Sequence, residues 1–265
     1  DESCEYPEPG DYSLSFDGED DYVILPNHLL YGRDNFSIEI LFYAEPGQNG
    51  YSNIYQKPQA TKARYEVNGS QFHITISTDN GSISTFVEPP PSFNEWHSLL
   101  ISYDGNQYVT ILDDNTIDSQ PLSGNINNQD PFYIGNWQTT EGFKGRIDNF
   151  IIDSQDGILA DYKFNAGTGD ILYDHSGNGN HGIINGATWS ENIYGCTDPC
   201  LENYNPDANW DDGSCGEFVG CPDNGDYTLS FDGNDDYVSV YDESGADNRP
   251  LKGVQNNFSI LAYFS

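Results

Sequence analysis

Residues 10–23, GDYSLSFDGEDDYV, decide the fold of this chain, and they recur at residues 225–238 as GDYTLSFDGNDDYV. Twelve of the fourteen positions are identical, so the chain contains an internal repeat. Each copy has alternating residues on both sides of an Asp–Gly pair, which is the pattern of two strands joined by a tight turn. We therefore expect Asp17–Gly18 to form a β-hairpin, and the second copy to begin another unit of the same kind.

Short alternating segments continue to residue 192, separated by Gly, Asn, Asp and Pro, and no stretch has helical periodicity. Residues 35–44 show the strand pattern best, with Phe36, Ile38, Ile40 and Phe42 on one face. The expected strands are residues 12–16, 20–25, 35–44, 51–57, 63–69, 71–78, 82–88, 96–105, 108–114, 131–137, 143–153, 159–165 and 181–189. They predict an all-β sandwich or jelly roll over residues 10–192, large enough to bury a core between two sheets.

Acidic residues dominate the composition: 43 Asp and Glu stand against nine Lys and Arg, so the formal charge is −34. A field of this sign repels nucleic acids and anionic membranes, and neither is expected as a partner. No apolar run is long enough for membrane insertion. Repulsion would destabilise a compact fold unless cations bind, and calcium prefers the oxygen ligands in which this chain is rich. The alternative is a solvated acidic surface that keeps an extracellular protein soluble.

Four of the five cysteines fall between residues 196 and 221. Such a cluster indicates disulfides and an oxidising compartment, so we expect a secreted protein. A bond between Cys196 and Cys215 would stabilise the Asp/Asn-rich loop that they bracket, which has almost no core. Cys200–Cys221 is then the expected second bond, although four cysteines allow three pairings. Cys4 is left over, and we expect its partner outside this chain.

Several segments together resemble laminin G-like domains of the concanavalin A-like superfamily. They are SLSFDGEDDYV, NFSIEILFYA, NEWHSLLISYDG with YVTILDDN, FKGRIDNFIID and DYKFNAGTGDILYDHSGNGNHGIINGATW, in the order seen in that family. The resemblance covers residues 10–192 and implies a concanavalin A-like jelly-roll β-sandwich. It does not decide the function, because the family includes glycan-binding modules, adhesive modules and passive spacers.

GCTDPCLENYNPDANWDDGSC at residues 195–215 resembles the short Cys-bounded linker repeats of surface proteins in aquatic bacteria. DESC at residues 1–4 resembles the end of such an element. The chain then divides into the tail of a preceding linker (1–9), a laminin G-like sandwich (10–192), a Cys-rich linker repeat (193–224) and the incomplete start of a second sandwich (225–265). The rest of a longer polypeptide or a neighbouring chain would complete the second sandwich, as in strand addition.

Side-chain oxygens alternate in the linker at Asn205, Asp207, Asn209 and Asp211, a spacing with which a short loop surrounds calcium. The glycine falls too late and no bidentate Glu follows, so an EF-hand is excluded. The alternative is a cluster of Asn/Asp turns that hydrogen-bond to their own backbone.

DHSGNGNHG at residues 174–182 is a second oxygen-rich loop. Its candidate ligands are Asp174, Asn178 and Asn180. The resemblance to laminin G-like domains implies that a structural calcium near such a loop also uses Asp148 of the G-x-I-D strand. A plain turn is the alternative. His175 and His181 have no Cys or third His nearby, so zinc is not expected.

Two other groups of residues have competing interpretations. Asp17, Asp20 and Asp21 recur in the second copy, where their spacing favours a turn first and a carboxylate ligand set second. The aromatic residues, Trp96, Trp137 and Trp189 among them, could form a sugar-stacking platform. Alternating aromatic residues in strands are more often part of a core.

Catalysis finds little support, since the chain has no E-x-D-x-x-E run, no G-x-S-x-G and no Gly-rich phosphate loop before a helix. We expect a non-enzymatic, calcium-stabilised extracellular repeat protein that serves as a surface adhesin or as the subunit of an extracellular filament. Its partners would be neighbouring copies of the same repeat. The alternative is a carbohydrate-binding module of a secreted polysaccharide-degrading enzyme, which would bind surface glycans.

Overall fold

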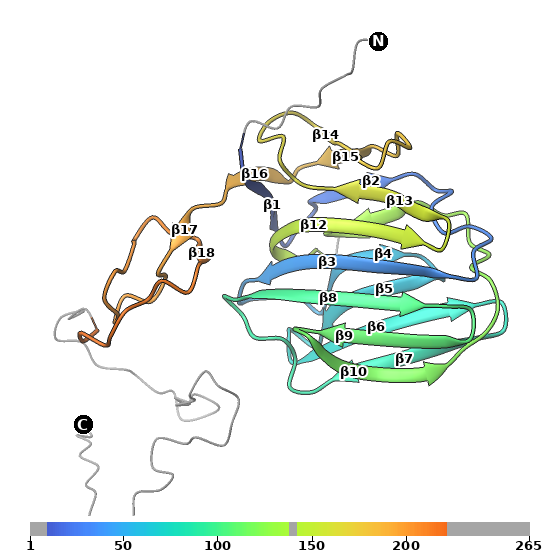
Figure 1. Cartoon of the computed structure of the whole chain (residues 1–265), viewed down its shortest axis with the longest axis horizontal. Helices are drawn as coiled ribbons and strands as arrows, with labels where there is room; N and C mark the ends of the chain where they lie inside the picture. Colours follow the sequence, from blue (N-terminus) through green and yellow to red (C-terminus); the bar gives the residue numbers. More distant parts are fainter. Residues whose placement is uncertain (1–9, 138–141, 222–265) are drawn as a thin grey trace, which may run out of the picture. The chain divides into compact units, whose positions relative to one another are not determined.

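The computed structural model describes residues 10–137 and 142–221. The predictions for Cys4, for the preceding linker at 1–9 and for the second sandwich at 225–265 lie outside the described residues. Within the described part the chain is all-β, with no helix, and two eight-stranded sheets form a jelly-roll-like sandwich (Figure 1). The predicted fold class is confirmed.

Sheet A has the strand order β10-β9-β8-β3-β12-β1-β16, and β13 also pairs with β12. Its strands are β1 (Tyr12–Asp17), β3 (Phe36–Ala44), β8 (Trp96–Tyr103), β9 (Gln107–Leu112), β10 (Asn115–Pro121), β12 (Lys144–Ser154), β13 (Gly157–Tyr162) and β16 (Thr188–Glu191). All pairings in this sheet are antiparallel.

Sheet B has the order β14-β15-β2-β11-β4-β5-β6-β7 and is also antiparallel. Its strands are β2 (Tyr22–Leu25), β4 (Tyr51–Lys57), β5 (Thr61–Glu66), β6 (Gln71–Thr78), β7 (Gly81–Val87), β11 (Phe132–Ile134), β14 (Ile171–Leu172) and β15 (Gly182–Asn185). A separate parallel pair, β17 (Tyr194–Gly195) and β18 (Trp210–Asp211), follows the sandwich.

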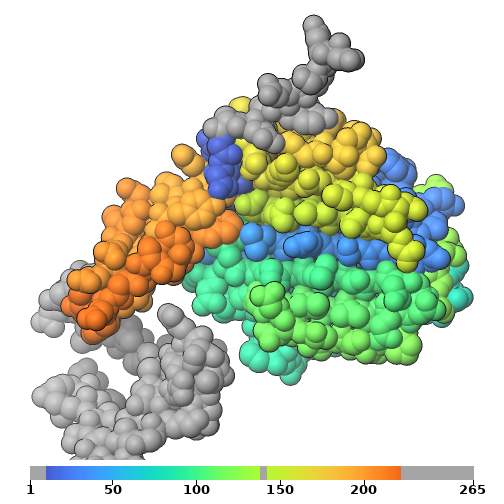
Figure 2. Space-filling view, in the orientation of Figure 1, coloured from blue at the N-terminus to red at the C-terminus, as the bar shows by residue number. Residues whose placement is uncertain are grey.

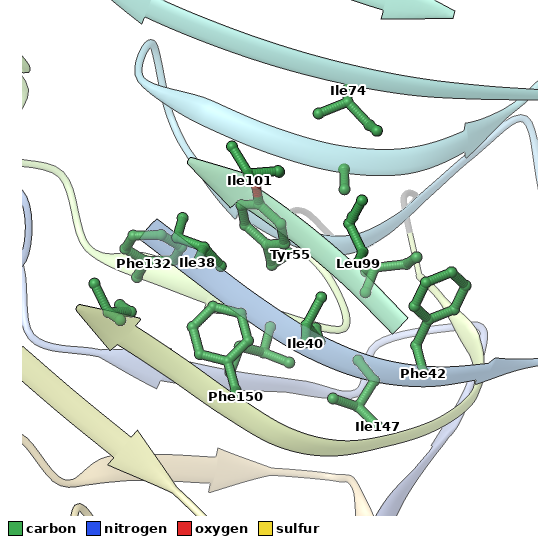
Figure 3. Packing of buried hydrophobic residues seen from close by; sticks show 14 of the residues in the cluster. Ile38, Ile40, Phe42, Tyr55, Ile74, Leu99, Ile101, Phe132, Ile147 and Phe150 are labelled. Carbon is green, nitrogen blue, oxygen red and sulfur yellow. The ribbon is translucent and has the colours of Figure 1, made fainter. Parts of the chain in front are cut away.

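Apolar side chains from the inner faces of the two sheets fill the core (Figure 3). Phe36, Ile38, Ile40 and Phe42 of β3 are each at most 3% exposed, so the predicted inward face of this strand is confirmed. Phe42 stacks on Phe72 of sheet B, with ring centroids 5.9 Å apart. Full burial of one such side chain contributes about 1.5–3 kcal/mol, so the facing sheets supply the main driving force for folding.

The Asp17–Gly18 turn does not form a hairpin, and this prediction is wrong. β1 pairs with β12 and β16 in sheet A, whereas β2 pairs with β11 and β15 in sheet B. The turn therefore carries the chain from one layer of the sandwich to the other. Asp21 stabilises this crossing, because its Oδ2 accepts a 2.9 Å hydrogen bond from the backbone N–H of Asp17.

A second crossing lies against the first. The stretch predicted as one strand at residues 181–189 forms β15 in sheet B and β16 in sheet A. Gly186 lies between them with a φ of 81°, and a Cβ there would lie 2.1 Å from Asp21 Oδ1. Only glycine fits this conformation at such a close approach, so the two layer changes are packed together around Asp21.

Strand β10 was not expected, because its sequence NTIDSQP has no apolar face and is largely exposed. It forms through main-chain pairing with β9 at the edge of sheet A, where its terminal Pro121 is tolerated. β14, β17 and β18 have two residues each and are too short to produce a periodic pattern.

Candidate functional site

The segment after β16 packs against the outer face of sheet A, where Figure 2 shows it in orange beside the sandwich. Trp210 of β18 stacks on Trp96 of β8, with ring centroids 4.1 Å apart and planes 25° apart. Tyr194 of β17 lies 5.5 Å from Trp210 on the same centroid measure. We call the contact between the segment and the sheet the joint. It is formed by Tyr43, Trp96, Arg146, Tyr194, Asn209 and Trp210.

Arg146 of β12 is the charged residue of the joint and is 7% exposed. Its guanidinium carbon lies 4.4 Å from the Tyr43 ring centroid and 5.2 Å from that of Trp96. Its Nη2 donates a 2.5 Å hydrogen bond to the backbone carbonyl of Asn209. Burial lowers the pKa of Arg146, yet a guanidinium remains protonated, so the rings and the carbonyl stabilise a buried cation.

Asn209 also attaches the segment through its side chain. Its Oδ1 accepts a 3.0 Å hydrogen bond from the Ile193 backbone N–H, and its Nδ2 donates a 2.8 Å bond to the Glu191 carbonyl. These bonds connect the loop to the end of β16. The amide predicted as a calcium ligand thus holds the loop in place, and its calcium role stays a prediction.

Two carboxylates lie beside the joint. Asp148 of β12 is 8% exposed, and Asn192 Nδ2 donates to Asp148 Oδ2 at 3.3 Å and to Asp11 Oδ1 at 2.9 Å. The Tyr194 hydroxyl donates to Asp11 as well. Burial, with the nearby charge of Asp11, raises the pKa of Asp148 to about 7. Two neighbouring carboxylates such as Asp11 and Asp148 can share a proton or bind a cation. Their oxygens are ligands of the type that calcium prefers, and the calcium role of Asp148 stays a prediction.

Asp174 is fully buried and organises its own loop. Its carboxylate accepts hydrogen bonds of 2.8–2.9 Å from the backbone N–H groups of Asp161, Ser176 and Asn180 and from the Ser176 hydroxyl. Burial opposes ionisation, but these bonds outweigh it and lower the pKa of Asp174. Four donors already satisfy the carboxylate. This arrangement is the one expected if residues 174–182 form a plain turn and not a calcium loop.

The other predicted ligands of this loop also have partners within it. Asn178 and Asn180 donate to the carbonyl of Leu159 at 3.2 and 2.8 Å. His181 Nδ1 accepts a 3.0 Å bond from the Asp174 backbone N–H, which is a structural role. Asp148 was predicted to share a calcium ion with this loop, but its Oδ2 accepts its hydrogen bond from Asn192, which lies outside the loop. Calcium binding by this loop stays a prediction.

The linker loop is closed by the disulfide Cys196–Cys215, and Cys200 and Cys221 are disulfide-bonded too. The two expected disulfides are therefore present. Four predicted ligands lie in this loop: Asn209, described above, and Asn205, Asp207 and Asp211. Asn205 Oδ1 accepts a 3.1 Å bond from the Asp207 backbone N–H, and Asp211 Oδ1 accepts a 2.9 Å bond from that of Gly213. Both bonds are Asn/Asp turns, the alternative that the sequence left open for this loop. Calcium binding by the loop stays a prediction.

Asp17, Asp20 and Asp21 form the one three-membered group of acidic, His or Cys side chains in the described ranges whose potential ligand atoms all lie within 4.8 Å. Burial raises the pKa of Asp21, and the charges of Asp17 and Asp20 add to this effect. The three carboxylates thus meet at the crossing between the sheets.

A second cluster, on the outer face of sheet B, was not indicated by any motif. Arg64 Nη2 and His73 Nδ1 both contact Glu66 Oε1, at 2.6 and 2.7 Å. Tyr51 lies under Arg64, 4.2 Å from the guanidinium carbon to the ring centroid, and Phe86 stacks on His73 at 4.3 Å and 10°. We call these five residues the patch. One signal in the sequence could have indicated this cluster. Lys62, Arg64 and Glu66 alternate along β5, which places three charged side chains on one face of a strand in a chain with only nine Lys and Arg residues.

The tryptophans considered as a platform lie apart. Trp96 is stacked with Trp210, and Trp189 Nε1 donates to the Gly169 carbonyl at 2.9 Å. Their strands, β8 and β16, are four positions apart in sheet A, which corresponds to about 19 Å. No ring contact joins Trp96, Trp137 and Trp189 in the part of the chain that the structure describes.

Comparison with known proteins agrees with this architecture. Residues 17–155 match the laminin G-like family model of the Concanavalin A-like lectin/glucanases superfamily. No sequence among the curated proteins matches the chain. None of the described segments is a helix long and apolar enough to cross a membrane.

Solved structures match at low identity and show the fold alone. A provisionally named carbohydrate binding protein from Bacteroides ovatus has a TM-score of 0.54 and 15% identity, over 68% of this chain and 60% of that one. Domains LG4-5 of the mouse laminin α1 chain have a TM-score of 0.43 and 15% identity, over 57% and 43%. Domain 4 of an extracellular arabinanase from Geobacillus stearothermophilus, in complex with arabinotriose, has a TM-score of 0.42 and 15% identity, over 56% and 71%.

Proposed function

The chain belongs to the Concanavalin A-like lectin/glucanases superfamily. We propose that it is a non-enzymatic, extracellular repeat protein that holds sandwiches at fixed positions. It serves as a surface adhesin or as the subunit of an extracellular filament. Its partners are neighbouring copies of the same repeat, and calcium stabilises it. The two disulfides support an extracellular location.

The joint is the observation that carries this proposal. In a flexible spacer we would expect neither a buried Arg146 nor a stack of Trp210 on Trp96, because each contact removes conformational freedom from the segment. Three kinds of contact hold the segment: ring stacking, a cation among rings, and side-chain hydrogen bonds from Asn209. A segment held in this way transmits orientation from one sandwich to whatever follows the linker, as an adhesin stalk or a filament requires.

The variant Trp210→Ala tests the joint in the full chain. The stack contributes about 0.5–1.5 kcal/mol beyond its buried area, so its loss should release the segment. Backbone 15N relaxation should give residues 196–215 of the wild type the order parameters of β3, near 0.85, and values below about 0.6 in the variant. Tyr204→Ala is the matched control, since Tyr204 lies in the same segment and is 41% exposed. Independent motion of the wild-type segment would contradict the proposal.

A second candidate function is carbohydrate binding, as in a module of a secreted polysaccharide-degrading enzyme. The patch favours it, because two half-exposed aromatic rings flank polar groups on an open sheet face. One of the structures compared, with a TM-score of 0.54, is described as a carbohydrate binding protein. A glycan array with and without chelator tests this candidate, which predicts binding to at least one glycan. Binding that is lost on chelation would support both carbohydrate binding and calcium binding.

A further inference from the structure

We propose that the patch on the outer face of sheet B is a binding site for an uncharged polysaccharide lying across β4–β7. This inference rests on the second candidate function and names its site and ligand class. The site would lie on the layer opposite the joint, since the patch belongs to sheet B and the joint to sheet A.

Register places the five side chains on one surface. Arg64 pairs with His73, which pairs with Phe86, so these three form one row across β5, β6 and β7. Tyr51 pairs with Glu66 in the next row of the same face. The intervening residues of β5 point into the core, as the complete burial of Tyr65 shows. From β4 to β7 the patch is about 14 Å wide, taking three strand spacings.

The rings are held in position before any ligand arrives. Arg64 covers one face of the Tyr51 ring, and His73 covers one face of the Phe86 ring, yet the two aromatic residues remain 47% and 53% exposed. Aromatic surfaces that are fixed and half-exposed suit the apolar faces of sugar rings and cost little conformational entropy on binding.

The polar groups between the rings provide donors and acceptors in a rigid arrangement. Hydrogen bonds from His73 and Arg64 outweigh burial and lower the pKa of Glu66, so it is a carboxylate. Burial lowers the pKa of His73, which is therefore neutral, and its Nε2 accepts a 3.0 Å bond from the Thr75 hydroxyl. The Arg64 and Glu66 charges cancel. Sugar hydroxyls are both donors and acceptors, and a charge-paired Arg–Glu–His network can satisfy them.

The charge of the chain favours an uncharged ligand. The whole chain carries a formal charge of −34, which repels polyanions such as carboxylated or sulfated glycans.

Affinity electrophoresis of the full chain tests the site. The uncharged probes are dextran, xyloglucan and galactomannan, and the polyanions are alginate and heparin. We expect binding to at least one uncharged probe, weakened about tenfold by Phe86→Ser or by Tyr51→Ser, because loss of a ring costs about 1.4 kcal/mol. Ile183→Ser is the matched control, since Ile183 is 58% exposed on sheet B outside the patch. Thermal melting of each variant shows that the fold is retained.

The remaining outcomes separate the inference from the function on which it rests. Binding to alginate or heparin alone would overturn the ligand class and leave carbohydrate binding standing. Binding to an uncharged probe that neither patch variant weakens would overturn the site. Failure of all five probes to bind would overturn both the inference and the second candidate function.

Discussion

At the scale of single residues, Asp148 shows how position determines chemistry. Its neighbours Asp11 and Asn192 are 181 residues apart, and they meet only because β1 and β16 pair beside β12. The motif around Asp148 was visible in the sequence, but a second carboxylate beside it was not. Long-range pairing of this kind leaves no local pattern, and the same holds for Phe86 beside His73.

The raised pKa of Asp148 predicts a pH dependence. The folded state keeps a proton up to a pH of about 7, whereas the unfolded chain releases it near 3.8, so unfolding releases a proton between these values. Stability from this group is therefore highest at low pH and is lost as the pH rises towards 7. In EDTA, Asp148→Asn should raise stability at pH 7.5 by about 1–3 kcal/mol and flatten the slope of the melting temperature between pH 5 and 7.5.

Asp153→Asn is the control for this prediction, because Asp153 lies on the same strand and its side chain is only partly buried. Its slope should match that of the wild type. If Asp148→Asn also left the slope unchanged, Asp148 would not be the group that titrates.

At the scale of elements, alternation of apolar residues was sufficient to predict the long core strands such as β3. It was not sufficient for β10, which has no apolar face, or for the layer changes at Asp17–Gly18 and Gly186. An Asp–Gly turn satisfies its own backbone equally well in a hairpin and in a crossing between sheets, so the local sequence does not distinguish them. Which sheet a strand joins depends on contacts with distant strands.

The linker segment contains few buried residues, and this predicts its response to reduction. Cys196 is fully buried, but most of the segment to Cys221 is exposed, so the disulfides replace a core. Closing a loop of this length contributes about 3 kcal/mol. Dithiothreitol should therefore abolish hydrogen-exchange protection in residues 196–215 and leave that of β3 and β12 intact. Equal loss of protection in both regions would show that sandwich and linker unfold as one unit.

At the scale of the whole molecule, a charge of −34 predicts that cations stabilise the chain in two separable ways. Sodium chloride screens repulsion between surface charges, whereas a calcium site adds a binding term of about 2.7 kcal/mol when calcium is at one hundred times its Kd. Composition predicted the need for cations. It did not predict the geometry: the structure gathers Asp17, Asp20 and Asp21 but satisfies Asp174 within its own loop.

Calcium chloride should therefore raise the melting temperature above that in sodium chloride of equal ionic strength, and EDTA should reverse the increment. The double variant Asp207→Asn/Asp211→Asn leaves the acceptor Asn205 Oδ1 in place and gives position 211 an amide oxygen that can accept the Gly213 bond. It removes two charges from the linker loop, so it should reduce the increment if that loop binds calcium. Asp153→Asn/Asp156→Asn removes the same charge elsewhere and should leave the increment intact. Equal melting temperatures in the two salts would mean that screening alone stabilises the chain, and the calcium hypothesis would fail for both loops.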